Sequence, residues 1–472
     1  MAGETIGVRE EFNTGRVVLL AAVAALGGFL FGFDTAVING TVVAVREQFG
    51  MGAGLTGFVV SSALLGCIVG AYLAGRLADR WGRIRVMVLA AVLFSVSALG
   101  SGIAFGPWDL IVWRVVGGLG VGAASVIAPA YIAEISPAAV RGRLGSLQQL
   151  AIVTGIFVAL LSDAFLAGVA GGAAEELWLG QEAWRWMFWA ELVPAVAYGV
   201  LSLQIPESPR YLVAKGQHEQ AHAVLSQVLT TGVRERIEEI RRTLREERRT
   251  SFADLRKPGG GGLLPIVWIG IALSVFQQFV GINVIFYYSS TLWQSVGFTE
   301  ADALTQTVIT SVTNIVVTVV AIALIDRIGR RKLLLIGSAG MFVTLGLLAV
   351  VFGTADLVEN AQGVLEPVLG DTQGVIALLA ANGFVVFFGM SWGPAVWVLL
   401  GEMFNNRIRG TALGLAAAAQ WLANFAISTS FPKMAEIGLS FAYGFYTACA
   451  LLSFFFVLRF VPETRGRQLE DM

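Results

Sequence analysis

Twelve long apolar stretches divide this chain, and they limit the folds open to it more than any other feature. Each is long enough for a helix to cross the ~30 Å hydrocarbon core of a bilayer, which takes about 20 residues. Backbone polar groups in that core must be satisfied within the chain, so each stretch should be a helix. We therefore predict an all-α integral membrane protein with twelve transmembrane helices. The stretches lie near residues 17–40, 55–77, 86–106, 108–131, 145–167, 185–205, 264–288, 305–326, 333–353, 375–400, 408–431 and 440–461.

Composition also favours a membrane protein over a soluble enzyme. Hydrophobic residues make up 56% of the 472 residues and charged residues only 14%, whereas soluble proteins carry roughly 25% charged residues. The net charge of -1 gives no basic excess that would attract nucleic acid. Cys67 and Cys449 lie in separate apolar stretches, which predicts buried thiols. No pairing of nucleophile and base and no metal-ligand spacing indicates an enzyme, a metal site or a cofactor.

The basic residues predict the orientation in the membrane. If the N-terminus is cytoplasmic, 28 Lys and Arg fall in cytoplasmic segments and three on the opposite side. The positive-inside rule then predicts that both termini are cytoplasmic. No small-residue cleavage site follows residues 1–16, so the first stretch should be retained as a helix. We expect a multi-pass protein of the plasma membrane, or of the inner membrane where a cell has two.

A polar insert separates the first six apolar stretches from the last six. It is rich in charges of both signs and in helix-forming Glu, Arg and Leu, so short cytoplasmic helices are expected, with a solvated linker as the alternative. The expected parts are an N-terminal six-helix bundle at 1–206, a cytoplasmic linker at 207–262 and a C-terminal six-helix bundle at 263–472.

Three charged motifs recur in both halves of the chain in the same order. They are residues 75–83 and 326–331, offset by 247; Glu134 and Glu402, each seven residues before Arg-Gly, offset by 268; and the Pro-Glu pairs at 206–207 and 462–463, offset by 256. Internal repetition of this kind predicts two pseudo-symmetric bundles. All the motifs fall on the predicted cytoplasmic side, where weak ion pairs between helix ends, each worth about 0–1 kcal/mol, can together bias an equilibrium between two conformations and so form a gate on that side. The alternative is that Arg80, Arg83 and Arg330 serve only as topology anchors. The residues proposed for this cytoplasmic gate are Asp79, Arg80, Arg83, Glu134, Arg141, Asp326, Arg330, Glu402 and Arg409.

These motifs, together with the Pro-Glu pairs that end the two halves, resemble those of the sugar porter family of the major facilitator superfamily. The resemblance runs from Phe31 to Gly466. It implies two six-helix bundles, a sugar site near the membrane midplane between them, and transport by alternating access.

Three ionisable side chains stand out inside predicted helices, where a charge is costly and marks function. Asp34, Arg114 and Glu191 each lie about six residues from the outer end of their stretch, which permits one cluster. Protonation of a carboxylate there would weaken its contact with the arginine and so favour one conformation. Residues 31–35 resemble the region where proton-coupled sugar porters carry an aspartate and animal glucose facilitators an asparagine, which favours symport. The alternative is a purely structural ion pair.

Amides and aromatic rings inside the apolar stretches suit a sugar, whose hydroxyls both donate and accept. Any single amide could instead join two helices by hydrogen bonding. Gly281 and Pro394 are expected to loosen or bend their helices, and Tyr287 and Tyr288 to gate the entrance or belong to an interfacial aromatic belt. The resemblance places sugar ligands at Phe31, Gln149, Gln277, Gln278, Asn283, Asn314, Trp397, Gln420, Trp421 and Asn424.

The sequence thus predicts a secondary active transporter that imports a monosaccharide with a proton and works as a monomer in the lipid bilayer. Glucose is the first candidate, because Ile156 stands where some xylose-transporting relatives have a glutamine. The alternatives are a facilitative uniporter, a symporter for xylose, galactose or inositol, and a membrane sugar sensor. The match of residues 39–41 to a glycosylation acceptor carries no prediction.

Overall fold

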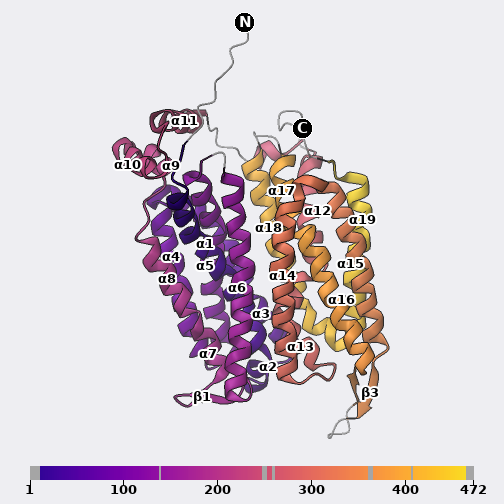
Figure 1. Ribbon diagram of the computed structural model, residues 1–472. Coiled ribbons are helices and arrows are strands. Elements are labelled where there is room, and N and C mark those ends of the chain that lie inside the picture. Colours follow the sequence, from indigo (N-terminus) through magenta and orange to yellow (C-terminus); the bar gives the residue numbers. More distant parts are fainter. Residues whose placement is uncertain are drawn as a thin grey trace.

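The computed structural model describes residues 11–137, 140–246, 252–257, 261–359, 365–404 and 408–463. Two bundles of long helices stand side by side, the first drawn in indigo to magenta and the second in orange to yellow (Figure 1). The side chains of Arg141, Asp326 and Arg409, all predicted gate residues, lie outside the described part.

The N-terminal bundle contains six membrane crossings, two of which are broken into two helices. The first crossing is α1 with α2, and the sixth is α7 with α8. Its helices are α1 (Thr14–Ala36), α2 (Ile38–Gln48), α3 (Ala53–Trp81), α4 (Arg83–Gly102), α5 (Pro107–Ile135), α6 (Arg141–Ala170), α7 (Ala183–Ala190) and α8 (Leu192–Ser202).

The C-terminal bundle also contains six crossings, and its first and fourth are broken into two helices. Its helices are α12 (Pro265–Phe279), α13 (Ile282–Gln294), α14 (Glu300–Ile328), α15 (Arg330–Gly353), α16 (Asp371–Met390), α17 (Trp392–Met403), α18 (Arg409–Ile437) and α19 (Leu439–Phe460). Every predicted apolar stretch corresponds to one crossing, so the predicted fold class is confirmed.

Ten helical segments among the described residues are long and apolar enough to cross a membrane by length and composition alone. The two crossings outside that set are α7 with α8, which carries Arg185 and Glu191, and α18, which carries Gln420 and Asn424. Their polar residues lower the hydropathy, and both nevertheless lie among the other helices of their bundles (Figure 1).

The two ends of the bundles carry different elements, and we name the two sides of the molecule the linker side and the hairpin side after them. The linker side carries α9 (Pro209–Ala214), α10 (His218–Val228), α11 (Val233–Glu246) and the short 3-10 helix η1 (Phe252–Leu255). The hairpin side carries two antiparallel hairpins, β1 (Glu176–Trp178) with β2 (Gln181–Glu182) and β3 (Asp356–Glu359) with β4 (Leu365–Val368). Figure 1 shows the linker helices at one end and both hairpins at the other.

The linker helices pack on the start of the chain. The Asn13 N–H donates to the Val228 carbonyl oxygen at 2.9 Å, and the Thr230 N–H donates to the Glu11 carbonyl oxygen at 2.8 Å. One face of α10 is buried, including Leu225. The predicted short helices are therefore confirmed for 209–246, and the alternative of a purely solvated linker is wrong there.

The repeated charged motifs fold into the same structure in both bundles. Gly82 has φ 99° and Gly329 has φ 95°, a left-handed region that favours glycine, and each ends one helix and precedes the next. The Glu207 carboxylate accepts from the N–H groups of Arg83 (2.9 Å) and Ile84 (3.2 Å) at the start of α4. Glu463 accepts in the same way from the first two N–H groups of α15, at 3.1 and 3.2 Å. This correspondence confirms the pseudo-symmetry.

Candidate functional site

The broken crossings place polar groups in the middle of the bundles. Gly281 adopts φ 84° between α12 and α13, and Ser391 interrupts the crossing between α16 and α17, three residues before Pro394. The bending predicted from Gly281 and Pro394 is therefore found. Interrupted helices release backbone groups, which is tolerated in a membrane protein where the segment lines a site between helices.

Asp34 on α1 and Arg114 on α5 form a buried ion pair. Arg114 Nη1 lies 3.7 Å from Asp34 Oδ1 and donates to the Asp34 carbonyl oxygen at 2.8 Å. Both side chains are about fully buried, with exposures of 1% and 2%. Asp34 Oδ2 has no hydrogen-bond partner among the described residues. An isolated buried charge would cost several kcal/mol, so the arginine is what permits a carboxylate here.

Glu191 joins the same cluster. It lies at the break between α7 and α8, is 1% exposed, and interacts electrostatically with both Asp34 and Arg114. Its Oε1 atom has no hydrogen-bond partner among the described residues. Asp34 and Arg114, two of the three charges expected to share one depth, therefore form an ion pair, and Glu191 lies near enough to interact electrostatically with both.

The amides of α12 and α13 lie around the Gly281 break. Gln277 Nε2 donates to the carbonyl oxygen of Trp392 at 2.8 Å, so it ties α12 to α17. Asn283 Nδ2 donates to Gln278 Oε1 across the break. Gln277 Oε1 is buried without a partner among the described residues, which leaves it as an acceptor for a ligand hydroxyl.

A second polar group lies where α13 meets α18. Asn424 Nδ2 donates to the Tyr287 hydroxyl at 3.4 Å, and Ser428 Oγ donates to Asn424 Oδ1 at 3.0 Å. The Tyr288 hydroxyl donates to the Ser428 carbonyl oxygen at 2.8 Å, and the Tyr288 ring packs on Phe431. Both tyrosines are buried among helices, so an interfacial aromatic belt does not describe them.

The two bundles meet at an aromatic contact beside these amides. The Phe31 ring on α1 lies 5.7 Å from the Trp421 ring on α18, measured between centroids. Gln420 Oε1, next to Trp421, is buried without a partner among the described residues. A ring pair beside free amide oxygens suits a sugar, which has both C–H faces and hydroxyls.

The remaining predicted ligands are less closely placed. Gln149 on α6 is half-buried, and its neighbour Gln148 is buried against Gly28 of α1. Asn314 on α14 lies close to Gly389 of α16. Trp397 is 43% exposed on α17. The structure thus brings the α1, α12, α13 and α18 residues together, and among the described residues no hydrogen bond or ring contact joins them to Gln149, Asn314 or Trp397.

The predicted gate charges pair within each bundle. Arg83 Nη2 lies 2.8 Å from Glu134 Oε1, and Arg330 Nη2 lies 2.8 Å from Glu402 Oε1. Asp79 also pairs with Arg83, at 3.3 Å, but its side chain is 77% exposed. Arg80 is exposed on the linker side, with its carbonyl oxygen accepting from the Tyr211 hydroxyl. In this conformation these two main pairs join helices of one bundle.

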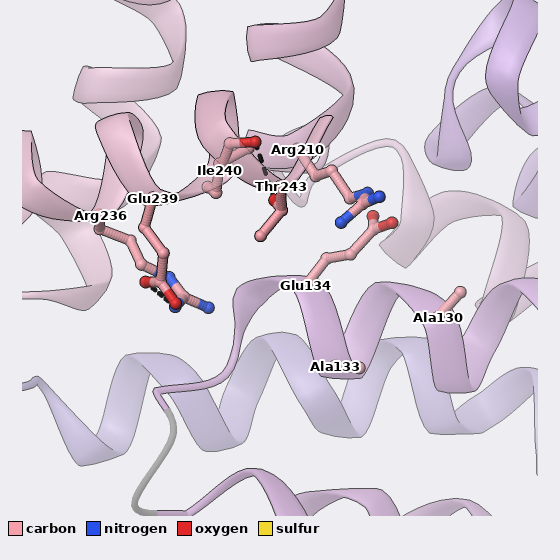
Figure 2. A pocket seen from close by; sticks show the side chains of 8 residues that line it. All are labelled: Ala130, Ala133, Glu134, Arg210, Arg236, Glu239, Ile240 and Thr243. Carbon is pink, nitrogen blue, oxygen red and sulfur yellow. Dashed lines mark hydrogen bonds and ion pairs between the residues drawn. The ribbon is translucent and has the colours of Figure 1, made fainter. Parts of the chain in front are cut away.

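A cavity of about 410 Å³ lies beside the first of these pairs, between α5 and the linker helices. Figure 2 shows the Arg210 and Glu134 side chains pointing toward each other, with Arg236 and Glu239 on the opposite wall. Its lining has no amide and no aromatic ring, so it does not suit a sugar. The lining residues are Ala130, Ala133, Glu134, Arg210, Arg236, Glu239, Ile240 and Thr243.

Polar contacts that the sequence did not predict join the bundles on the hairpin side. Asn39 on α2 is 0% exposed and donates from Nδ2 to the Phe286 carbonyl oxygen and to Ser289 Oγ, both at 2.8 Å. Its Oδ1 accepts from the Ser290 N–H at 3.0 Å. We call these contacts between Asn39 and α13 the Asn39 clasp. The sequence signal for these contacts was an amide side chain, that of Asn39, within the first apolar stretch.

Two further contacts join the bundles on that side. The hydroxyls of Ser61 on α3 and Thr429 on α18 lie 2.6 Å apart. Glu300 Oε1, at the start of α14, accepts from the Ala173 N–H just after α6 at 3.0 Å. Three separate contacts between the bundles therefore close the hairpin side in this conformation.

Two pseudo-symmetric helical bundles with broken crossings, buried amides and a buried ion pair are typical of a membrane transporter for a polar solute. The model of the family described as "Sugar (and other) transporter" matches residues 20–472. The chain belongs to this sugar transporter family, the sugar porters of the major facilitator superfamily.

Individual relatives agree along the whole chain. The chain is 60% identical to a glucose transport protein of Synechocystis sp. over 462 residues, which are 98% of this chain and 97% of that protein. It is 38% identical to the D-xylose-proton symporter of Escherichia coli, over 98% of this chain and 96% of that one. Among solved structures, the partially occluded inward open conformation of the xylose transporter XylE from E. coli matches with a TM-score of 0.82 at 36% identity, over 96% and 100% of the two chains.

Proposed function

We propose that this protein imports a monosaccharide, with glucose the first candidate, together with a proton by alternating access. The buried Asp34–Arg114 pair beside the two-bundle amide region is the observation that carries the proposal. The 60% identical relative named as a glucose transport protein supports glucose, and the relative named as a proton symporter supports coupling.

Proton coupling is assigned to the Asp34 cluster. Asp34 Oδ2, which has no partner among the described residues, offers a place for the proton. Protonation would remove one charge from a pair whose separation is 3.7 Å and so weaken the attraction that ties α1 to α5. A ligand shifts a conformational equilibrium only by its different affinity for the two states, and a contact that exists in one protonation state supplies that difference. Glu191 is a second carboxyl group that interacts electrostatically with Arg114.

Sugar binding is assigned mainly to the C-terminal bundle, with Phe31 contributed from α1. The free oxygens of Gln277 and Gln420 would accept from sugar hydroxyls, and Trp421 would cover a C–H face of the ring. The remaining proposed ligands, on the grounds of the family resemblance, are Gln149, Gln278, Asn283, Asn314, Trp397 and Asn424.

The conformation described here fits the state closed toward the outside. Three interbundle contacts close the hairpin side, and the match to an inward open conformation of a relative agrees with that direction. We assign the linker side, with both termini, to the cytoplasm of a plasma or inner membrane, and the unit to a monomer. Residues 1–206 and 263–472 would move as two bodies joined by 207–262.

The linker-side charges are proposed to act in the opposite state. When the cytoplasmic ends approach, the charges of the intrabundle pairs Arg83–Glu134 and Arg330–Glu402 would also attract opposite charges of the other bundle. Tyr287 is the better candidate for a gate of the sugar path, because its hydroxyl contacts Asn424, whereas Tyr288 is held by Ser428 and Phe431.

The test is [14C]glucose uptake into proteoliposomes, with and without an imposed inward proton gradient. Accumulation above the outside concentration is expected only with the gradient, and Asp34→Asn should abolish accumulation while retaining glucose exchange. Glu47→Gln, an exposed carboxylate on α2, is the control and should accumulate normally. Equilibration that ignores the gradient in both proteins would make the carrier a uniporter with a structural ion pair. Absence of glucose flux would direct the assay to xylose, galactose and inositol.

A further inference from the structure

Asp163 is a buried carboxylate that lies apart from the Asp34–Arg114 pair. It lies on α6 and is 0% exposed. Its Oδ2 accepts from the Gly40 N–H at 3.2 Å, while its Oδ1 has no partner among the described residues. An acid buried inside the membrane with a single backbone contact costs free energy, which points to a role for that contact.

The reason lies in the broken first crossing. Gly40 is the third residue of α2, which begins at Ile38, and the first N–H groups of a helix have no carbonyl partner four residues back. Within a membrane such an N–H must be satisfied by another part of the protein. A carboxylate at a helix N-terminus is also favoured by the helix dipole. Asp163 therefore caps α2 from the neighbouring helix.

The residue at position 40 is fitted to this contact. A Cβ at Gly40 would lie 2.5 Å from Asp163 Cβ and 2.6 Å from Oδ2, so a larger residue would push α2 and α6 apart. Gly40 is also the immediate neighbour of Asn39, whose side chain holds Phe286, Ser289 and Ser290 of the other bundle. The cap and the Asn39 clasp therefore share the first turn of α2.

We propose that Asp163 is a positioning residue that caps α2, presents Asn39 to the clasp, and thereby favours the conformation closed on the hairpin side. The inference rests on the alternation of conformations proposed above. Asp163 and Asn39 belong to the same bundle, so the cap exists before the bundles close. Without it, forming the clasp must also order the first turn of α2, which opposes closure.

The expected effect of Asp163→Ala is a shift of about tenfold toward the conformation open on the hairpin side, the effect of losing one charge-assisted hydrogen bond. Asp163→Asn keeps an acceptor oxygen and should restore most of the closed population. A role that needs only the negative charge would not show this rescue.

Distances between two spin labels on the hairpin side, measured by pulsed electron paramagnetic resonance on the full chain in liposomes, give the two populations. Ala174 and Ser295 are exposed label positions on the two bundles, introduced as cysteines after Cys67→Ala and Cys449→Ala. Elution as one monodisperse peak checks folding. If Asp163→Ala does not fold, Gly40→Ala disturbs the same contact and should give the same shift.

Combined variants identify the route. Asn39→Ala alone should shift the populations, and adding Asp163→Ala should change them little further, because both act on one contact. Ser61→Ala removes a different interbundle contact and should add its effect to that of Asp163→Ala.

An unchanged distance distribution in Asp163→Ala would overturn the proposal. An Asp163→Asn variant with the same distance distribution as Asp163→Ala would also overturn it. If the variants shift the two populations as expected but the protein takes up no sugar, the proposed function is refuted. The proposed role of Asp163 as the cap of α2 is then still supported.

Discussion

Side chains in the candidate site differ in how far the protein itself satisfies their hydrogen bonds. Gln277 uses its amide N–H to hold α17, whereas the buried oxygen of Gln420 has no partner among the described residues. Removing a group that already bonds the protein costs stability, while removing a group free for ligand costs affinity. The two glutamines can therefore be separated by experiment.

We predict that Gln420→Leu raises the Kd for glucose by about tenfold, the effect of one hydrogen bond, with little change in thermal stability. Gln277→Leu should weaken binding and also lower the free energy of unfolding by about 1–2 kcal/mol, because the contact with Trp392 is lost. Tryptophan fluorescence titration gives Kd, and thermal unfolding in detergent gives stability. Equal losses of stability in both variants would contradict this division.

The buried charges lead to a second prediction at this scale. Arg114→Gln leaves Asp34 and Glu191 without their cation, and removal of one partner from a buried pair costs about 3–5 kcal/mol. We expect a strongly lowered melting temperature in Arg114→Gln and partial recovery in the double variant with Asp34→Asn. Thermal unfolding measures both, and uptake assays should show that the recovered protein still fails to accumulate sugar. A double variant less stable than Arg114→Gln would argue against the pair.

At the level of helices, the breaks in the crossings position the polar groups. The α12–α13 break depends on Gly281, whose positive φ is unfavourable for any residue with a Cβ. A Cβ there would also lie 2.8 Å from the Tyr446 ring of α19. The break and the packing of α19 are thus coupled through one small residue.

Gly281→Ala is expected to destabilise the protein by at least about 1–2 kcal/mol, the cost of a left-handed alanine, and to reduce glucose affinity because Gln278 and Asn283 flank the break. Gly414→Ala on α18 is the matched control, since a Cβ there meets nothing within 4 Å. In a helix interior that change should be neutral or slightly stabilising. Thermal unfolding and glucose titration of both variants check the prediction, which fails if the two behave alike.

For the whole molecule, the key property is which side of the two-bundle assembly is closed. The Ser61–Thr429 contact joins the bundles, whereas Ser338 and Ser453, with hydroxyls 2.8 Å apart, join α15 to α19 inside one bundle. These two contacts have similar chemistry and separation but differ in whether they cross between the bundles. They allow a matched test of bundle movement.

A disulfide between Ser61→Cys and Thr429→Cys should lock the hairpin side shut and lower uptake at least about tenfold, and dithiothreitol should restore it. The same cross-link between Ser338→Cys and Ser453→Cys should leave uptake nearly unchanged, because both helices move together. Uptake into proteoliposomes before and after reduction measures both, in a protein with Cys67 and Cys449 replaced by alanine. Full activity with the interbundle bond formed would rule out bundle rocking.

Much of the fold follows from local sequence. The apolar stretches, the charged motifs at similar offsets and the composition of the polar insert were sufficient for the crossings, the two bundles and the linker helices. The depth of Asp34, Arg114 and Glu191 in their stretches was sufficient to predict a cluster, because a buried charge needs a partner nearby.

The tertiary structure alone decided which polar groups meet across the bundles. Asn39 reads as an unremarkable amide and Asp163 was overlooked, because their partners lie on helices far away in sequence and depend on how each helix is rotated and broken. The tertiary structure alone also decided which side of the two-bundle assembly is closed. The sequence must suit two conformations that differ by little free energy, so it determines the helices and their faces, while packing between bundles selects one conformation.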